Sequence, residues 1–138
     1  MTTTATTRSR TGRLAAVAGA VALATTGLTV GVTSTASAAS CLDGYKLLSK
    51  PAGESYSPTG TGWYKTTSAC QDINFRLNSV AHSSGRYVKV CFQRTGCQAD
   101  YTWVKPGEWT EIATVVKDDT NYRFKFLTDG SILGRRAA

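Results

Sequence analysis

Apolar and polar side chains alternate along much of the chain after residue 40. In residues 73–77 (INFRL) the apolar side chains fall on every second position, which predicts a strand with one buried and one solvated face. The same period of two recurs in RYVKVCF (86–92) and NYRFKFL (121–127), and EWTEIATVV (108–116) adds a β-branched run. These patterns predict an all-β fold.

Short turn-forming segments separate the predicted strands. They are His82-Ser83-Ser84-Gly85, Arg94-Thr95-Gly96, Pro106-Gly107 and Asp118-Asp119-Thr120-Asn121. Asp129-Gly130, with apolar residues on both sides, is the signal of a two-residue hairpin. We therefore expect a small antiparallel β-sandwich or barrel of about six to eight strands, stapled by two disulfides.

The ends of the chain show other patterns. Residues 1–38 consist of a basic N-terminal region, an apolar stretch and a cleavage site of small residues. This pattern predicts a secretory signal peptide rather than a membrane helix. A lipid anchor on Cys41 fits less well, because Ala38 stands where a large apolar residue is expected. Residues 39–66 read as an N-terminal arm with a flexible Gly/Ser/Pro-rich loop, residues 67–134 as the core, and residues 135–138 as a frayed tail.

Four cysteines, at positions 41, 70, 91 and 97, remain after the signal peptide. An even number in a small exported domain predicts two disulfides. Three pairings are possible, and we favour Cys41–Cys70 and Cys91–Cys97 because the second pair spans a short turn. Gaps of 28, 20 and 5 residues do not suit a zinc site, so we expect no metal.

The net charge alone does not indicate a particular class of binding partner. The whole chain has 16 basic side chains. Without the three arginines of the predicted signal peptide, 13 basic and 9 acidic side chains remain, which gives a net charge of +4. Because both signs are interspersed along the chain, we expect no nucleic-acid binding and, after cleavage of the signal, no membrane association. The sequence leaves the oligomeric state open.

Groups for catalysis are sparse. His82 is the only histidine and lies in a turn, where we expect a solvated side chain. Glu108 and Glu111 point to opposite faces of their predicted strand, and oxidised cysteines offer no thiolate. We expect no enzyme activity and no cofactor, because no acid–base pair can be assembled.

Binding residues are easier to nominate. Arg94 lies in the turn between Cys91 and Cys97, where it suits the acidic pocket of a trypsin-like protease. Aromatic and basic residues beside the Gly-rich loop suit a protein contact or a sugar platform; these candidates are Tyr56, Trp63, Tyr64 and Lys65. We expect Trp103 and Trp109 to be buried.

Two disulfides, the all-β pattern and the stretch Tyr101–Ala113 with its central Pro106-Gly107 resemble small exported proteins of actinomycetes. The architecture of residues 60–127 is similar to that of tendamistat-type α-amylase inhibitors. These are six-stranded sandwiches whose two disulfides join successive cysteines. That family inhibits through a Trp-Arg-Tyr triplet, where this chain has Trp63-Tyr64-Lys65. In its size and its predicted N-terminal arm, the chain also resembles the small adaptor subunits of umbrella-shaped toxin particles.

Together these features predict a secreted, non-enzymatic protein that binds another extracellular protein through residues 39–66 and their aromatic side chains. An inhibitor of a secreted amylase or trypsin-like protease is the alternative, and a carbohydrate-binding module is the third possibility.

Overall fold

The computed structural model describes residues 40–138. The predicted signal peptide over residues 1–38 lies outside the described residues. A single helical turn, over residues 40–43, precedes the first strand. Within the described part, no helix combines the length and the hydropathy that crossing a membrane requires.

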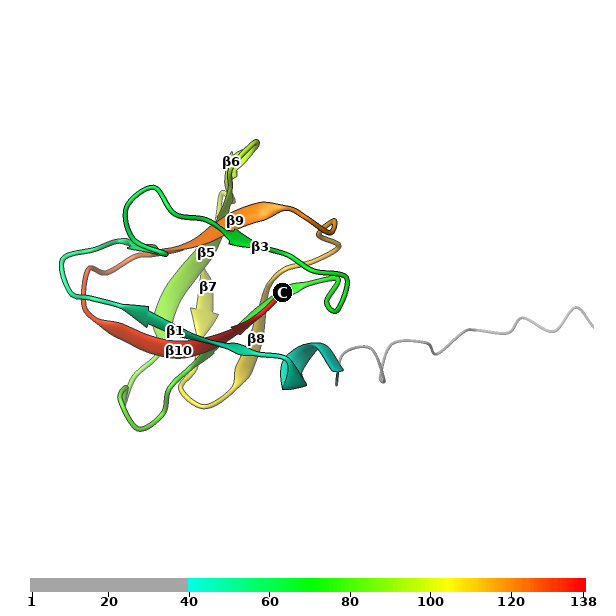
Figure 1. The fold of residues 1–138 in the computed structure, drawn as a ribbon. Helices are drawn as coiled ribbons and strands as arrows, with labels where there is room; N and C mark the ends of the chain where they lie inside the picture. Colours follow the sequence, from blue (N-terminus) through cyan, green and yellow to red (C-terminus); the bar gives the residue numbers. More distant parts are fainter. Residues whose placement is uncertain (1–39) are drawn as a thin grey trace, which may run out of the picture. The chain divides into compact units, whose positions relative to one another are not determined.

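Ten strands in two antiparallel sheets make up the described chain, which confirms the predicted all-β fold (Figure 1). Six strands have five or more residues: β1 (Lys46–Lys50), β4 (Ile73–Leu77), β5 (Arg86–Phe92), β8 (Trp109–Ala113), β9 (Asn121–Phe126) and β10 (Ile132–Ala137). The other four are β2 (Tyr56–Ser57), β3 (Tyr64–Lys65), β6 (Gly96–Cys97) and β7 (Thr102–Val104), each too short to show a period in the sequence. The sheets stay separate, so the fold is a sandwich and not a closed barrel.

Sheet A has the strand order β1-β10-β4-β8, so β10 is an interior strand. Arg135 pairs with Leu47 of β1 on one side and with Arg76 of β4 on the other. The pairing continues to Ala137, which is buried. The expectation that residues 135–138 form a frayed tail is therefore wrong, because two neighbouring strands hold this segment.

Sheet B has the order β2-β9-β5-β6, with β3 also paired to β9 and β7 also paired to β5. In β9, Tyr122, Phe124 and Phe126 point into the core, and the residues between them face outward. The register sets Lys89 of β5 opposite Lys125 of β9. The outward side chains of the two longest strands of this sheet thus come together on one face.

Most connections between the long strands cross from one sheet to the other. Because β9 belongs to sheet B and β10 to sheet A, Asp129-Gly130 does not close the hairpin that the sequence predicts. Their apolar faces meet across the core instead of lying side by side. The turn Arg94-Thr95-Gly96 does close a hairpin between β5 and β6, with Gly96 at a φ of 85° that favours glycine.

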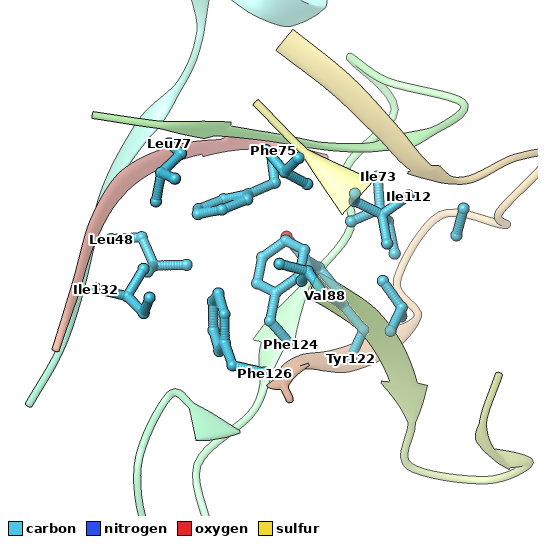
Figure 2. Packing of buried hydrophobic residues seen from close by; sticks show 13 residues of the cluster. Leu48, Ile73, Phe75, Leu77, Val88, Ile112, Tyr122, Phe124, Phe126 and Ile132 are labelled. Carbon is cyan, nitrogen blue, oxygen red and sulfur yellow. The ribbon is translucent and has the colours of Figure 1, made fainter. Parts of the chain in front are cut away.

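The core lies between the sheets and combines aliphatic with aromatic side chains. Figure 2 shows Phe75 of sheet A facing Phe124 and Phe126 of sheet B, with ring centres 5.4 and 5.7 Å apart. Leu48 and Ile132 fill one end of the same cluster (Figure 2). Thirteen buried residues form this cluster, and such burial is the main favourable term in the free energy of folding.

The two disulfides join Cys41 to Cys70 and Cys91 to Cys97, and no cysteine is free. Both favoured pairings are confirmed. Cys91 and Cys97 lie opposite each other in the β5–β6 register, so the bond clasps the hairpin. The other bond ties the helical turn to the segment before β4, where Ala137 packs against it.

The segment 39–66, expected to be an N-terminal arm with a flexible loop, contributes three strands to the sandwich. β1 pairs along its length with β10, while β2 and β3 both pair with β9. Leu48 enters the core, and the Nζ atom of Lys50 binds the carbonyl oxygens of Glu54 and Gly130. The predicted arm is wrong for the three segments 46–50, 56–57 and 64–65, because they pair with β10 and β9, whereas residues 51–55 and 58–63 between them lie outside the strands.

Candidate binding surface

The outer side of sheet B gathers cationic and aromatic side chains. On β9, Arg123 and Lys125 point away from the core, and on β5 Lys89 does the same. β2 brings Tyr56 beside Lys125 in the register. Because side chains alternate along each strand, one face of this sheet must be solvated, and here it carries three cations on adjacent strands.

Arg123 is held between two aromatic rings. Its guanidinium carbon lies 4.0 Å from the ring centre of Tyr56 and 4.6 Å from that of Trp63. Such stacking fixes a long, flexible side chain and leaves its charge in place. The Nε atom of Arg123 is buried and finds no hydrogen-bond acceptor among the described residues. An unpaired buried donor costs stability, and the Nε atom of Arg136 is in the same state.

Two lysines extend this cluster across the sheet. Lys89 and Lys125 are directly opposed in the β5–β9 pairing, with Lys89 Nζ 4.3 Å from the ring centre of Tyr101 and Lys125 Nζ 5.5 Å from that of Tyr56. Neither lysine, nor Arg123, forms an ion pair with another described residue. We call this surface the cation–aromatic face; it consists of Tyr56, Trp63, Lys89, Tyr101, Arg123 and Lys125.

Two of the predicted binding residues, Tyr56 and Trp63, thus belong to this face, while Tyr64 does not. The Tyr64 hydroxyl lies 2.8 Å from Ser57 Oγ, and its ring packs on Tyr122 at 5.7 Å between ring centres. Arg136 covers the ring of Tyr64, with its guanidinium carbon 3.9 Å from the ring centre. These contacts give Tyr64 a structural part at the margin of the core.

Lys65 and Arg94 lie at other places. Lys65 Nζ is 2.9 Å from the Asp119 carboxylate, and both side chains are more than half exposed, so this ion pair contributes little stability. Arg94 is exposed at the β5–β6 turn. With the β8–β9 loop, which includes Asp118 and Asp119, it lines an open hollow of about 780 Å³. The structure therefore separates the Arg94 candidate from the aromatic candidates.

The structure corrects two expectations about single residues. His82 is buried, not solvated, and its Nε2 accepts a hydrogen bond of 3.0 Å from the Leu133 backbone N–H. Burial lowers the pKa of His82, and the nearby Arg86 charge lowers it further. Trp103, expected to be buried, is 46% exposed, because β7 lies at an edge of sheet B. Trp109 is half-buried against the Cys41–Cys70 cluster.

Residues 40–138 contain no group of three or more histidine, cysteine or acidic side chains placed to hold a metal ion. Both cysteine pairs are oxidised, so their sulfur atoms are not available as thiolate ligands. What the outer side of sheet B offers is charge and flat aromatic area, which are means of recognition.

Comparison with protein-family models, with curated proteins and with solved structures gave no match to this chain. The resemblances drawn from the sequence therefore stay predictions.

Sequence reasoning missed Lys89, Arg123 and Lys125 as binding residues. The sequence did contain a sign of them, because all three occupy polar positions in strands whose apolar and polar residues alternate. A solvated strand face is usually polar, so that signal alone selects no site. What distinguishes these residues is the lateral pairing of β2, β5 and β9, which brings them together.

Proposed function

We propose that this protein is exported and acts without catalysis, as an adaptor or interaction module that binds an acidic surface of another extracellular protein. The cation–aromatic face is the docking surface. Two disulfides in a domain of this size suit an oxidising, extracellular compartment.

The observation that carries the proposal is the direct opposition of Lys89 and Lys125, with Arg123 next along β9. Like charges directly opposite each other destabilise a sheet pair. No described carboxylate forms an ion pair with these cations. Carboxylates of a bound protein would supply the missing counter-charges, because charge complementarity across an interface speeds association and selects the partner.

The aromatic members of the face favour a protein as the ligand. Arginine, tyrosine and tryptophan are the residues most often found as energetic anchors of protein interfaces. Stacking between Tyr56 and Trp63 already orders Arg123, so little side-chain entropy is lost when a partner binds. The face is thus prepared for contact before the partner arrives.

The test is capture of a partner from the producer's own culture medium with the tagged, exported chain, followed by binding measurements with the purified partner. We expect Arg123→Ala to raise the Kd at least tenfold, which corresponds to about 1.4 kcal/mol. Arg76→Ala, on the outer side of sheet A, is the matched control and should leave the Kd unchanged. Binding should also weaken as salt rises from about 0.1 M to about 0.5 M.

A purified partner that binds Arg123→Ala and Lys125→Glu as tightly as the unchanged chain would refute the proposal. So would an affinity that does not respond to salt. Thermal unfolding of each variant, followed by circular dichroism, shows whether a loss of binding reflects a loss of folding.

One observation favours the alternative of a hydrolase inhibitor. Arg94 is exposed in a turn whose two strands are joined by the Cys91–Cys97 bond, and Figure 1 shows this hairpin projecting past β9. A turn held in this way loses little entropy on entering a protease cleft. Inhibition of a trypsin-like protease that disappears with Arg94→Ala but persists with Arg123→Ala would establish the inhibitor and place its site at the hairpin.

A further inference from the structure

Two half-exposed aromatic rings meet at the end of sheet B away from Arg123. Tyr87 of β5 pairs directly with Trp103 of β7, and their ring centres lie 4.8 Å apart. Each side chain is 46% exposed. Aromatic side chains gain most from burial, so a neighbouring pair left open to solvent marks a contact surface that its own chain does not cover.

Gly85 fixes the position of the indole. A Cβ atom at Gly85 would collide with Cζ2 and Cε2 of Trp103, so only glycine lets the ring rest on this backbone. One side of the indole is therefore supported by the main chain, and the exposed part faces solvent. Such a supported ring is a rigid platform, because the strand and the glycine together limit its rotamers.

The platform forms one wall of an open hollow of about 380 Å³, within the usual range for small-molecule sites. Its other walls come from Arg86 and from the β9–β10 connection, where Thr128 and Asp129 lie. Arg86 Nη1 donates to the carbonyl oxygens of Ser84 at 3.1 Å and of Gly85 at 2.9 Å, which anchors the guanidinium at this rim. Apolar faces and polar groups thus share a single hollow.

We propose that this hollow binds a neutral sugar ring, such as a hexopyranose unit of an extracellular glycan. The C–H face of a pyranose matches an aromatic ring, and its hydroxyl groups match a carboxylate, a guanidinium and a threonine hydroxyl. Arg86 and Asp129 carry opposite charges, so the rim has no net charge to select an acidic sugar. A purely apolar ligand would leave both charged groups desolvated without a hydrogen bond.

This site is distinct from a sugar platform at Trp63, which the sequence suggested. The guanidinium of Arg123 lies over the Trp63 ring at 4.6 Å, so that ring is already occupied. The sugar site also does not rest on the protein-binding function proposed for the cation–aromatic face, and the two can be tested on separate variants.

The experiment is an NMR titration of the ¹⁵N-labelled exported chain with methyl glucoside, methyl galactoside, methyl mannoside and methyl N-acetylglucosaminide, each up to about 50 mM. The chain has three tryptophans, so the indole N–H signals of Trp63 and Trp109 serve as internal references. We expect at least one of these sugars to shift the Trp103 signal, with a Kd of about 1 mM, and to leave the other two in place.

Trp103→Ala should abolish binding, read from the backbone signals of Gly85 and Gly130. Asp129→Asn keeps the aromatic pair and should weaken binding about tenfold. Arg123→Ala should bind the sugar as the unchanged chain does, even if it has lost its protein partner. The proposal is overturned if no sugar shifts the Trp103 signal, if the backbone shifts persist in Trp103→Ala, or if glucuronate binds more tightly than its neutral counterpart.

Discussion

The Nζ atom of Lys50 lies 2.6 Å from the carbonyl oxygen of Gly130, a contact that joins the end of β1 to the β9–β10 connection. The same ammonium group binds the Glu54 carbonyl oxygen and lies 5.7 Å from the Phe126 ring centre. Lys50 is only 1% exposed. Burial lowers the pKa of this lysine, and the charges of Asp129 and Glu54 offset part of that shift.

Replacing Lys50 should destabilise the fold strongly. In Lys50→Met the apolar stem is kept, but the carbonyl oxygens lose a charged donor, so we expect the free energy of unfolding to fall by about 3 kcal/mol. Urea denaturation measures this change. Lys46→Met, at an exposed position of the same strand, is the control and should change it by less than about 0.5 kcal/mol. Equal urea midpoints for the two variants would contradict the role of Lys50.

His82 should make stability depend on pH near neutrality. Its pKa in the folded chain is lowered below the value of about 6.5 expected after unfolding, so the unfolded chain takes up the proton first as the pH falls. The contribution of the neutral imidazole is complete above about pH 6.5 and is lost as the pH falls toward the folded-state pKa.

We therefore expect the Tm to fall between about pH 7.5 and pH 5.5, a window that spans the unfolded-state pKa of about 6.5. His82→Gln keeps an acceptor for the Leu133 N–H but does not titrate, so its Tm should be nearly flat over this window. Calorimetry at several pH values gives the comparison, and a slope that survives in His82→Gln would assign the effect to other groups.

Gly134 should tolerate no side chain. A Cβ atom there would lie 2.6 Å from Cε2 of Phe75 and 2.7 Å from the Arg76 carbonyl oxygen, in the middle of sheet A. We expect Gly134→Ala to cost about 2–3 kcal/mol, because the core ring and the paired strand must both move. Gly130→Ala, where a Cβ meets open space, should have almost no effect in the same denaturation experiment. Equal stability of the two variants would disprove this packing.

Val115 should respond in the opposite direction. It is 89% exposed and has a φ of 51°, a left-handed conformation that disfavours β-branched side chains. Val115→Asn should raise the free energy of unfolding by about 1 kcal/mol, since asparagine adopts this conformation more readily. Val80→Asn, equally exposed at a residue without positive φ, should leave the free energy unchanged. No gain in Val115→Asn would show that the loop is unstrained.

Alternation in the sequence predicted the long strands and the faces they bury. Phe75, Phe124 and Phe126 all point inward as their spacing requires. Alternation does not say which strand lies beside which, and there the prediction failed. Asp129-Gly130 has the composition of a hairpin turn, yet the strands on either side of it pack in different sheets because each must cover the same core.

The candidate site shows the same limit. Tyr56 and Trp63 were predicted from composition, whereas the role of Arg123 depends on the pairing of β9 with β2, more than sixty residues earlier in the chain. Lys50 was hidden for a different reason. It stands next to Pro51 in a polar stretch, where a lysine is ordinarily solvated. Only the three-dimensional arrangement of the carbonyl oxygens explains why it is buried.

The interior place of β10 has a consequence for how the protein is made. Sheet A cannot close until residues 132–137 have been synthesised, because this last strand of the described chain separates β1 from β4. A chain that emerges from its amino end must therefore leave the edges of β1 and β4 that pair with β10 without their hydrogen-bond partners until translation has passed residue 137. If the chain is exported as proposed, this delay would hold it in the unfolded form that a translocation channel accepts.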